Sequence, residues 1–219
     1  MNDFLQNKII FFRNLGIENW STTFKKMHDF TILRNVYTFD EIWFVEHYPI
    51  FTQGQSYNNE KEKNLIHINN IPLIKTNRGG KITYHGPGQQ IVYFLIDLKR
   101  RHLTIRQLIN IMEKTIVTAL EKLYIKAYTK KQSPGVYINK KKICSLGLRV
   151  KKNFTLHGLA INVNMDLTPF NYIYPCGDIN IKMTQIKDFN KEIKLEDLKI
   201  ILIKTLSEFF QVFMIKKGK

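Results

Sequence analysis

The chain has 219 residues, 44% of them hydrophobic, which allows a globular core of normal size and excludes a disordered chain. No apolar run approaches the about 20 residues that span a bilayer, so we expect no membrane partner. The formal net charge is +16, but most basic residues are scattered lysines, whereas base-reading proteins rely on arginine, so we expect no nucleic-acid partner. Acidic protein partners and compositional drift both account for this charge, and the sequence leaves the choice open.

Short apolar runs and one helical pattern fill the first part of the chain. Strands are predicted at residues 9–13, 41–46, 72–75, 81–84 and 90–98. A helix is predicted at residues 20–34, with Phe24, Met27 and Ile32 facing inward.

The clearest helix is predicted at residues 105–123, where Thr104 and Gln107 form a capping box. Strands are predicted at residues 135–138, 142–150 and 155–163, and a last helix, with Phe213 on its apolar face, at residues 195–213. Because strands outnumber helices and come in runs, we predict an α+β fold with a mixed, largely antiparallel sheet and packed helices. No repeat or linker divides residues 1–219, so we expect a single domain.

Residues 78–90, RGGKITYHGPGQQ, combine glycine with polar side chains. Glycine lets backbone amides approach a ligand closely and adopts turns that other residues resist. The polar side chains among these glycines indicate a binding surface, although composition alone fits a glycine-rich hairpin turn equally well. His85 lies within the segment, and we place it at the ligand site.

The two cysteines lack CxxC spacing, which argues against a disulfide scaffold or a structural zinc site and favours a reducing cytoplasm. Cys176 follows Pro175 in a predicted loop, so its thiol is a candidate nucleophile, although a lone cysteine is more often inert. Cys144 lies in a predicted apolar strand, and we expect it to be structural.

Lys142 directly precedes apolar strand residues, so its stem can lie along the sheet while its amine points into a cleft. Lys140 and Lys141 are expected to be solvated turn lysines. An ammonium about 4 Å from a thiol favours the thiolate by up to about 4 kcal/mol at an effective dielectric near ~20. That is at most about three pKa units, which suffices to bring a cysteine below neutrality, so a Cys176–Lys142 pair can make a nucleophile.

We expect no metal and no cofactor. His85 and His157 have no nearby carboxylate at ligand-like spacing, and the dinucleotide and P-loop phosphate signatures are absent. His157 is interpreted as a hydrogen-bonded core histidine.

Several segments together resemble the lipoyl(octanoyl) transferase family, the octanoyl-carrier-protein–protein N-octanoyltransferases. The matching segments are residues 46–49 (EHYP), 51–55 (FTQGQ), 78–90, 134–137 (PGVY), 142–150, 157–163 and 175–177 (PCG). They run in order from about residue 40 to residue 177, and the RGGxxTYHGPGQ string is highly specific. The resemblance is weaker before residue 41 and after residue 177.

The resemblance implies a fold like the catalytic domain of biotin and lipoate protein ligases. It implies that Cys176 is the acyl-thioester nucleophile and that Lys142 lowers its pKa. It implies that the acyl substrate binds at Arg78, Gly79, Gly80, Lys81, Ile82, Thr83, Tyr84, His85, Ser145, Leu146, Gly147, Gly158, Leu159 and Ala160. The implied donor is octanoyl-acyl carrier protein, and the implied acceptors are lipoyl domains of 2-oxoacid dehydrogenase E2 subunits and the glycine cleavage H protein, without ATP or metal.

Three alternatives remain open. A lipoate or biotin protein ligase shares the fold but activates a free acid with ATP and needs no nucleophilic cysteine. A non-catalytic module would bind lipoyl domains or nucleic acid through the basic surface. An amidotransferase would move octanoyl groups between lipoyl domains and would also use a cysteine.

Overall fold

The computed structural model describes residues 2–56, 67–175 and 181–218. The helices are α1 (Asn2–Lys8), α2 (Trp20–Leu33), α3 (Ile105–Glu121) and α4 (Leu195–Phe210), with short 3-10 helices at Thr168–Tyr172 and Ile186–Asp188. The strands are β1 (Ile9–Glu18), β2 (Glu41–His47), β3 (Ile50–Gln53), β4 (His67–Ile68), β5 (Ile71–Lys75), β6 (Ile82–His85), β7 (Gln89–Leu95), β8 (Tyr128–Thr129), β9 (Gly135–Ile138), β10 (Lys141–Lys151), β11 (Phe154–Asn162) and β12 (Phe213–Lys216).

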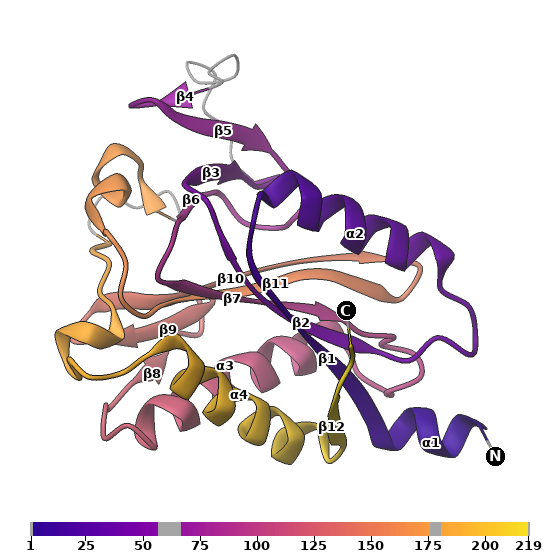
Figure 1. The fold of residues 1–219 in the computed structure, drawn as a ribbon. Coiled ribbons are helices and arrows are strands. Elements are labelled where there is room, and N and C mark those ends of the chain that lie inside the picture. Colours follow the sequence, from indigo (N-terminus) through magenta and orange to yellow (C-terminus); the bar gives the residue numbers. More distant parts are fainter. Residues whose placement is uncertain (1, 57–66, 176–180, 219) are drawn as a thin grey trace.

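Within these residues, eight strands form a large sheet in the order β12-β1-β2-β7-β11-β10-β9-β8, and four form a smaller sheet in the order β4-β5-β3-β6. In the large sheet, β1 pairs in parallel with β2 and β12, and the other pairs are antiparallel. Helices α3 and α4 cover one face of this sheet and α2 covers the other (Figure 1). The predicted α+β class with a mixed, largely antiparallel sheet is confirmed.

The central strands β2 and β7 read as continuous apolar runs because both of their faces are covered. Alternate side chains go to the two sides, as the pleat requires. Phe44 and Phe94 belong to the core shared with α3 and α4, whereas Trp43 and Leu95 belong to the core shared with Met27 of α2.

Helix α3 begins as predicted. Thr104 Oγ1 accepts a hydrogen bond from Gln107 N at 3.2 Å, and Gln107 Oε1 accepts one from Thr104 N at 2.8 Å, which completes the capping box. Among the described residues, no helix combines the length and the apolar character that crossing a bilayer requires.

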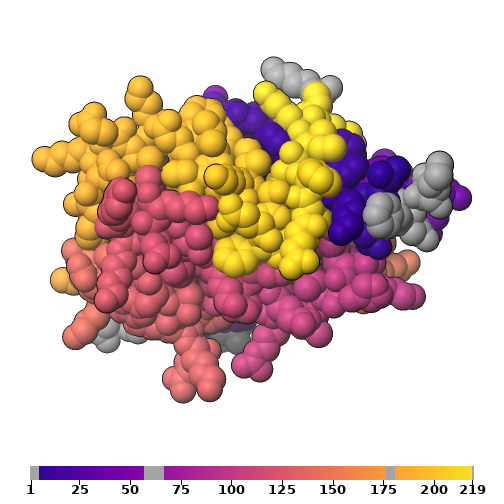
Figure 2. Space-filling view, turned by 90° about the horizontal axis from the view of Figure 1, so that it is seen from below, coloured from indigo at the N-terminus to yellow at the C-terminus, as the bar shows by residue number. Residues whose placement is uncertain are grey.

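Two helix predictions were wrong in detail. Helix α4 ends at Phe210 because Gln211 takes a left-handed conformation, with φ of +54°, and Phe213 opens β12 with 71% of its surface exposed. The C-terminal residues therefore lie beside the N-terminal ones, seen as yellow next to indigo in Figure 2. Ile32 is 54% exposed because the buried stripe of α2 is made by Trp20, Thr23, Met27 and Thr31.

Candidate active site

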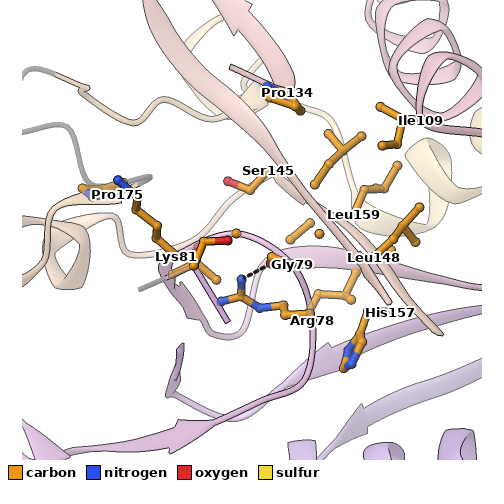
Figure 3. A pocket seen from close by; sticks show the side chains of 18 of the residues that line it. Arg78, Gly79, Lys81, Ile109, Pro134, Ser145, Leu148, His157, Leu159 and Pro175 are labelled. Atoms are coloured by element: carbon orange, nitrogen blue, oxygen red, sulfur yellow. Dashed lines mark hydrogen bonds between the residues drawn. The ribbon is translucent and has the colours of Figure 1, made fainter. Parts of the chain in front are cut away.

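A cavity of about 600 Å³ lies where the glycine-rich loop 78–81 meets β10 and β11 (Figure 3). Pro175 and Lys81 lie towards one end of the view and Ile109 towards the other, with Ser145 between them. Of the predicted acyl-binding residues, those that line the cavity are Arg78, Gly79, Gly80, Lys81, Ile82, Thr83, His85, Ser145, Leu146, Gly147, Gly158, Leu159 and Ala160. Their roles stay predictions, but the fold brings all of them to one place.

Tyr84 is placed differently. Its ring packs against Phe51 and Phe170, with centroids 5.3 and 5.6 Å away, in the core beneath the smaller sheet. Strand alternation explains this, because Tyr84 and its neighbour His85 point to opposite faces of β6.

A register shift in β10 sets the direction of the Lys142 side chain. Lys142 and Cys144 pair with the adjacent β9 residues Tyr137 and Val136, so Ile143 is one extra residue on β10. Ile143 and Cys144 both enter the core shared with α3, while Lys142 and Ser145 both line the cavity. In a regular strand Lys142 and Ser145 would point to opposite faces, so this β-bulge brings them to the same site.

The Lys142 side chain fits because residue 135 is glycine. Gly135 has φ of +144°, and a Cβ there would overlap Lys142 Cε and lie 2.8 Å from Cys144 O. Lys142 is only 1% exposed, and its Nζ donates a hydrogen bond to Pro134 O at 3.0 Å. The start of β9 therefore makes room for the ammonium and supplies an acceptor for it.

The Arg78 guanidinium holds the glycine-rich loop. Its Nη2 donates to Thr52 O at 2.5 Å and to Thr52 Oγ1 at 2.9 Å, and its Nη1 donates to Gly79 O at 3.0 Å. Gly79 N donates to Leu148 O at 2.9 Å. The loop is thus tied to β3 of the smaller sheet and to β10 of the larger one.

Buried hydrogen bonds lead away from Arg78 through β6 and β7. His85 Nδ1 lies 2.7 Å from Gln89 Oε1, and His85 Nε2 lies 3.2 Å from Thr52 Oγ1. Because an amide oxygen only accepts, Nδ1 carries the proton and Nε2 accepts from the Thr52 hydroxyl. Burial lowers the pKa of His85 to about 3, so the ring is neutral and can play both roles.

The same network continues to Lys142. Gln89 Nε2 donates to Asn162 Oδ1 at 2.9 Å, and Asn162 Nδ2 donates to Thr184 O at 2.9 Å. Thr184 N donates to Lys142 O at 3.0 Å. One continuous path of hydrogen bonds therefore joins the glycine-rich loop to the backbone of Lys142, and such buried networks hold their members rigidly.

His157 is buried and hydrogen-bonded, as predicted, and it also lines the cavity. Its φ of +66° is unusual for a residue other than glycine. Its ring packs beside the stacked pair of Trp20 and Phe24, with centroids 6.4 and 5.9 Å away, and its Nε2 lies 2.6 Å from Asn77 Oδ1. Burial lowers its pKa to about 3. At this end of the cavity, His157 therefore offers a neutral hydrogen-bonding group instead of a cation.

Of the two cysteines, Cys144 alone lies within the described residues. Cys176 lies outside the described residues, but the preceding residue, Pro175, lines the cavity. Cys144 is fully buried in the core, and burial raises the pKa of its thiol, which fits the predicted structural role. Among the described residues, no group of His, Cys, Asp and Glu side chains could hold a metal ion.

Part of the cavity wall was not predicted from the sequence. Ile105 and Ile109, one turn apart on α3, face the cavity, although neither is among the predicted site residues. Trp20, Ile91 and Tyr93 also line it. The sequence signal for this part of the wall was the width of the apolar stripe on α3. The stripe extends beyond the residues that are buried in the core, and Ile105 remains 43% exposed.

The chain matches the family model of the lipoyl protein ligase A/B catalytic domain over residues 22–207. It is 70% identical over 214 residues to a protein named octanoyltransferase from Buchnera aphidicola subsp. Acyrthosiphon pisum (strain APS), covering 98% of this chain and all of that protein.

Among solved structures, lipoate-protein ligase A bound with ATP gives a TM-score of 0.74 at 16% identity, over 95% of this chain and 87% of that one. Biotin protein ligase from Aquifex aeolicus gives a TM-score of 0.54 at 15% identity, over 93% of this chain and 68% of that one. These similarities confirm the predicted likeness to the biotin and lipoate ligase fold. The chain therefore belongs to the lipoyl protein ligase A/B catalytic domain family.

Proposed function

We propose that this chain is an acyltransferase that moves an octanoyl group from octanoyl-acyl carrier protein to a lysine of a lipoyl domain, through a thioester on Cys176. The observation that carries the proposal is the buried amine of Lys142 on the wall of a cavity that Pro175, next to Cys176, also lines. The relative named octanoyltransferase, identical at 70% of positions, supports the same reaction.

The reaction follows a ping-pong course. The Cys176 thiolate attacks the carbonyl carbon of the donor thioester, the carrier thiolate leaves and takes up a proton, and the octanoyl group stays on sulfur. The amine of the acceptor lysine then attacks this thioester, loses a proton and forms an amide, and the Cys176 thiolate is restored. The positive charge of Lys142 favours that thiolate in both halves of the reaction.

The cavity suits an eight-carbon chain. Ile109, Leu148 and Leu159 offer apolar surface on the cavity wall. Burial of about six methylenes at about 0.8 kcal/mol each stabilises the bound chain by roughly 5 kcal/mol. Gly147 and Gly158 pair with each other across β10 and β11 and both line the cavity, so neither adds a side chain that would narrow it.

Charge near the cavity supports acidic protein partners. Residues 122–165, which include β8 to β11, contain nine Lys residues and Arg149 but no Asp or Glu. Lys130 and Lys131 are exposed and directly precede the cavity residues 132–134. Exposed lysines beside the cavity, such as Lys130 and Lys131, attract acidic protein surfaces to the site. We assign this attraction to acyl carrier protein and to lipoyl domains of 2-oxoacid dehydrogenases and of the glycine cleavage H protein.

Intact mass spectrometry after mixing with octanoyl-acyl carrier protein tests the proposal. We expect a single octanoyl adduct on the unchanged protein without ATP, none on Cys176→Ala, and slow formation on Lys142→Ala. An adduct that persists on Cys176→Ala would show that the nucleophile is another group. Lipoyl-domain modification that needs free octanoate and ATP would instead assign the ligase reaction.

A further inference from the structure

Helix α3 presents a carboxylate to the start of β9. Ile105 and Ile109 line the cavity, and Glu113 follows one turn later on the same face of the helix. Glu113 Oε1 accepts a hydrogen bond from Gly135 N at 2.8 Å. No motif of the sequence pointed to Glu113, yet it contacts the segment that holds Lys142.

Both contacts fall on one peptide group. The N–H that Glu113 binds and the carbonyl oxygen that Lys142 Nζ binds at 3.0 Å belong to the single peptide bond between Pro134 and Gly135. That bond is not cis, and in a planar trans peptide the N–H and the C=O point in opposite directions. A carboxylate therefore holds one side of the peptide while an ammonium is held by the other.

We propose that Glu113 is a positioning residue of the active site, which orients and polarises the Pro134–Gly135 peptide so that its carbonyl holds the Lys142 amine in place. A hydrogen bond to a carboxylate is stronger than one to a neutral acceptor, and it increases the electron density on the carbonyl oxygen of the same peptide. The ammonium then binds a better acceptor in a fixed direction.

The local backbone needs such a restraint. Gly135, with φ of +144°, leaves the peptide a conformational freedom that other residues would not have, so a partner is required to fix its orientation. The charges of Lys142 and Glu113 also act on a common neighbour. Lys142 lowers the pKa of the Cys144 thiol and Glu113 raises it, although burial has the larger effect.

The inference rests on the proposed thioester on Cys176, and the test compares Glu113→Ala with Glu113→Gln in the whole chain. Gln keeps an oxygen that can accept from Gly135 N, whereas Ala removes it. We expect Cys176 octanoylation by octanoyl-acyl carrier protein to slow about ten- to hundredfold in Glu113→Ala, since small misplacements of catalytic groups cost rates of that order. Glu113→Gln should regain most of the loss, and KM for the donor should stay unchanged in both variants.

The matched control is Glu121→Ala, an exposed carboxylate at the end of the same helix, which should react at the unchanged rate. In labelled protein, the Gly135 amide proton and the Lys142 side-chain nitrogen should shift in Glu113→Ala but not in Glu121→Ala. Unchanged labelling in Glu113→Ala, a Gln variant as slow as Ala, or a raised KM alone would each overturn the inference. If the unchanged protein forms no Cys176 adduct, the thioester is wrong, and the two nuclear resonances still decide whether Glu113 positions Lys142.

Discussion

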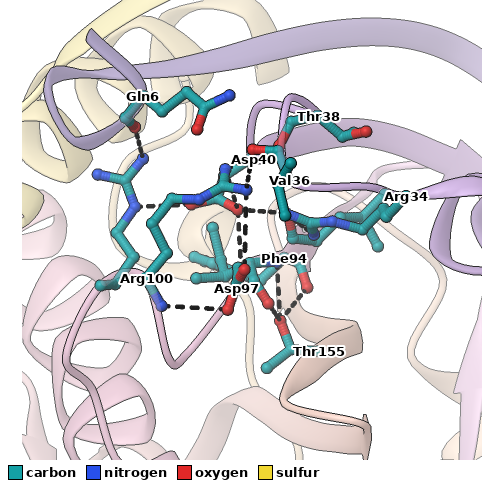
Figure 4. Close-up of polar contacts among 12 residues, drawn as sticks. Gln6, Arg34, Val36, Thr38, Asp40, Phe94, Asp97, Arg100 and Thr155 are labelled. Carbon is teal, nitrogen blue, oxygen red and sulfur yellow. Dashed lines mark hydrogen bonds and ion pairs between the residues drawn. The ribbon is translucent and has the colours of Figure 1, made fainter. Parts of the chain in front are cut away.

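Two buried charges show how differently this fold can use them. Asp40 has no exposed side-chain surface, and its carboxylate accepts from Arg34 Nη2 at 2.5 Å, from Arg101 Nε at 2.7 Å and from Asp97 N at 2.8 Å (Figure 4). Lys142 is equally buried, but it lines a cavity, and its Nζ donates to a neutral carbonyl oxygen at 3.0 Å.

The contacts of Asp40 and its arginine partners link separate parts of the fold. Arg101 donates to Gln6 O at 3.0 Å and to Ile9 O at 2.9 Å, and Arg34 donates to Leu95 O at 2.9 Å. The Asp40 carboxylate therefore connects the N-terminal segment, the end of α2 and the end of β7. A charge matched on all sides by opposite charges and donors is used to hold elements together, whereas a charge on a cavity wall can also act on a bound ligand.

The largest expected effect on stability comes from removing the Asp40 carboxylate, which links these elements. Asp40→Ala leaves Arg34 and Arg101 buried without their carboxylate, so the free energy of unfolding in urea should fall by about 3–5 kcal/mol. The exposed pair of Lys25 and Asp29 is the control, because Asp29→Ala should leave the free energy of unfolding almost unchanged. If Asp40→Ala and Asp29→Ala lost similar amounts of stability, the buried Asp40 carboxylate would matter no more to the fold than an exposed one.

Lys142→Met should have a large effect on activity and a smaller effect on stability. Met keeps most of the buried apolar stem and removes the charge, so octanoyl transfer should fall about hundredfold or more, while the free energy of unfolding should fall by less than in Asp40→Ala. Transfer assays and urea unfolding on the same preparation measure both quantities. A loss of stability as large as that of Asp40→Ala would make Lys142 a structural charge and would weaken the proposed role.

Sequence analysis succeeded where local pattern decides the structure. The capping box at Thr104 marked the start of α3, and Gly79 and Gly80 marked a cavity wall. It could not predict the bulge at Ile143, because a one-residue register shift is decided by the partner strand β9 and by residues 182–184, not by β10 itself. It also placed Phe213 in a helix, because β12 forms only by pairing with β1, which is distant in sequence.

Glu113 was missed for a related reason. A single carboxylate on an amphipathic helix resembles any solvated residue, and its partner on β9 becomes its neighbour only through tertiary packing. Lys142 was found because its position before an apolar strand is a local signal. The direction of its side chain, however, depends on Gly135, which belongs to another strand.

A third kind of buried polar group, neutral histidine, gives an effect on stability that depends on pH. Burial lowers the pKa of His47 to about 4, against 6.5 for the free side chain, and its Nδ1 lies 2.9 Å from Glu18 O, so Nδ1–H donates there and Nε2 accepts from the Tyr93 hydroxyl at 2.8 Å. The unfolded chain takes up a proton at this ring below about pH 6.5, while the folded chain does so only near pH 4.

Because the unfolded state binds more protons in that window, the stability contribution is present above pH 6.5 and is lost as the pH falls towards 4. The expected slope is about 1.4 kcal/mol per pH unit for each such histidine. Urea unfolding at about pH 7, 6 and 5 should show this slope, and His47→Gln should reduce it, whereas His67→Gln, at an exposed position, should not. A slope unaffected by His47→Gln would mean that the ring takes up its proton at the same pH in the folded and the unfolded chain, so that burial does not lower its pKa.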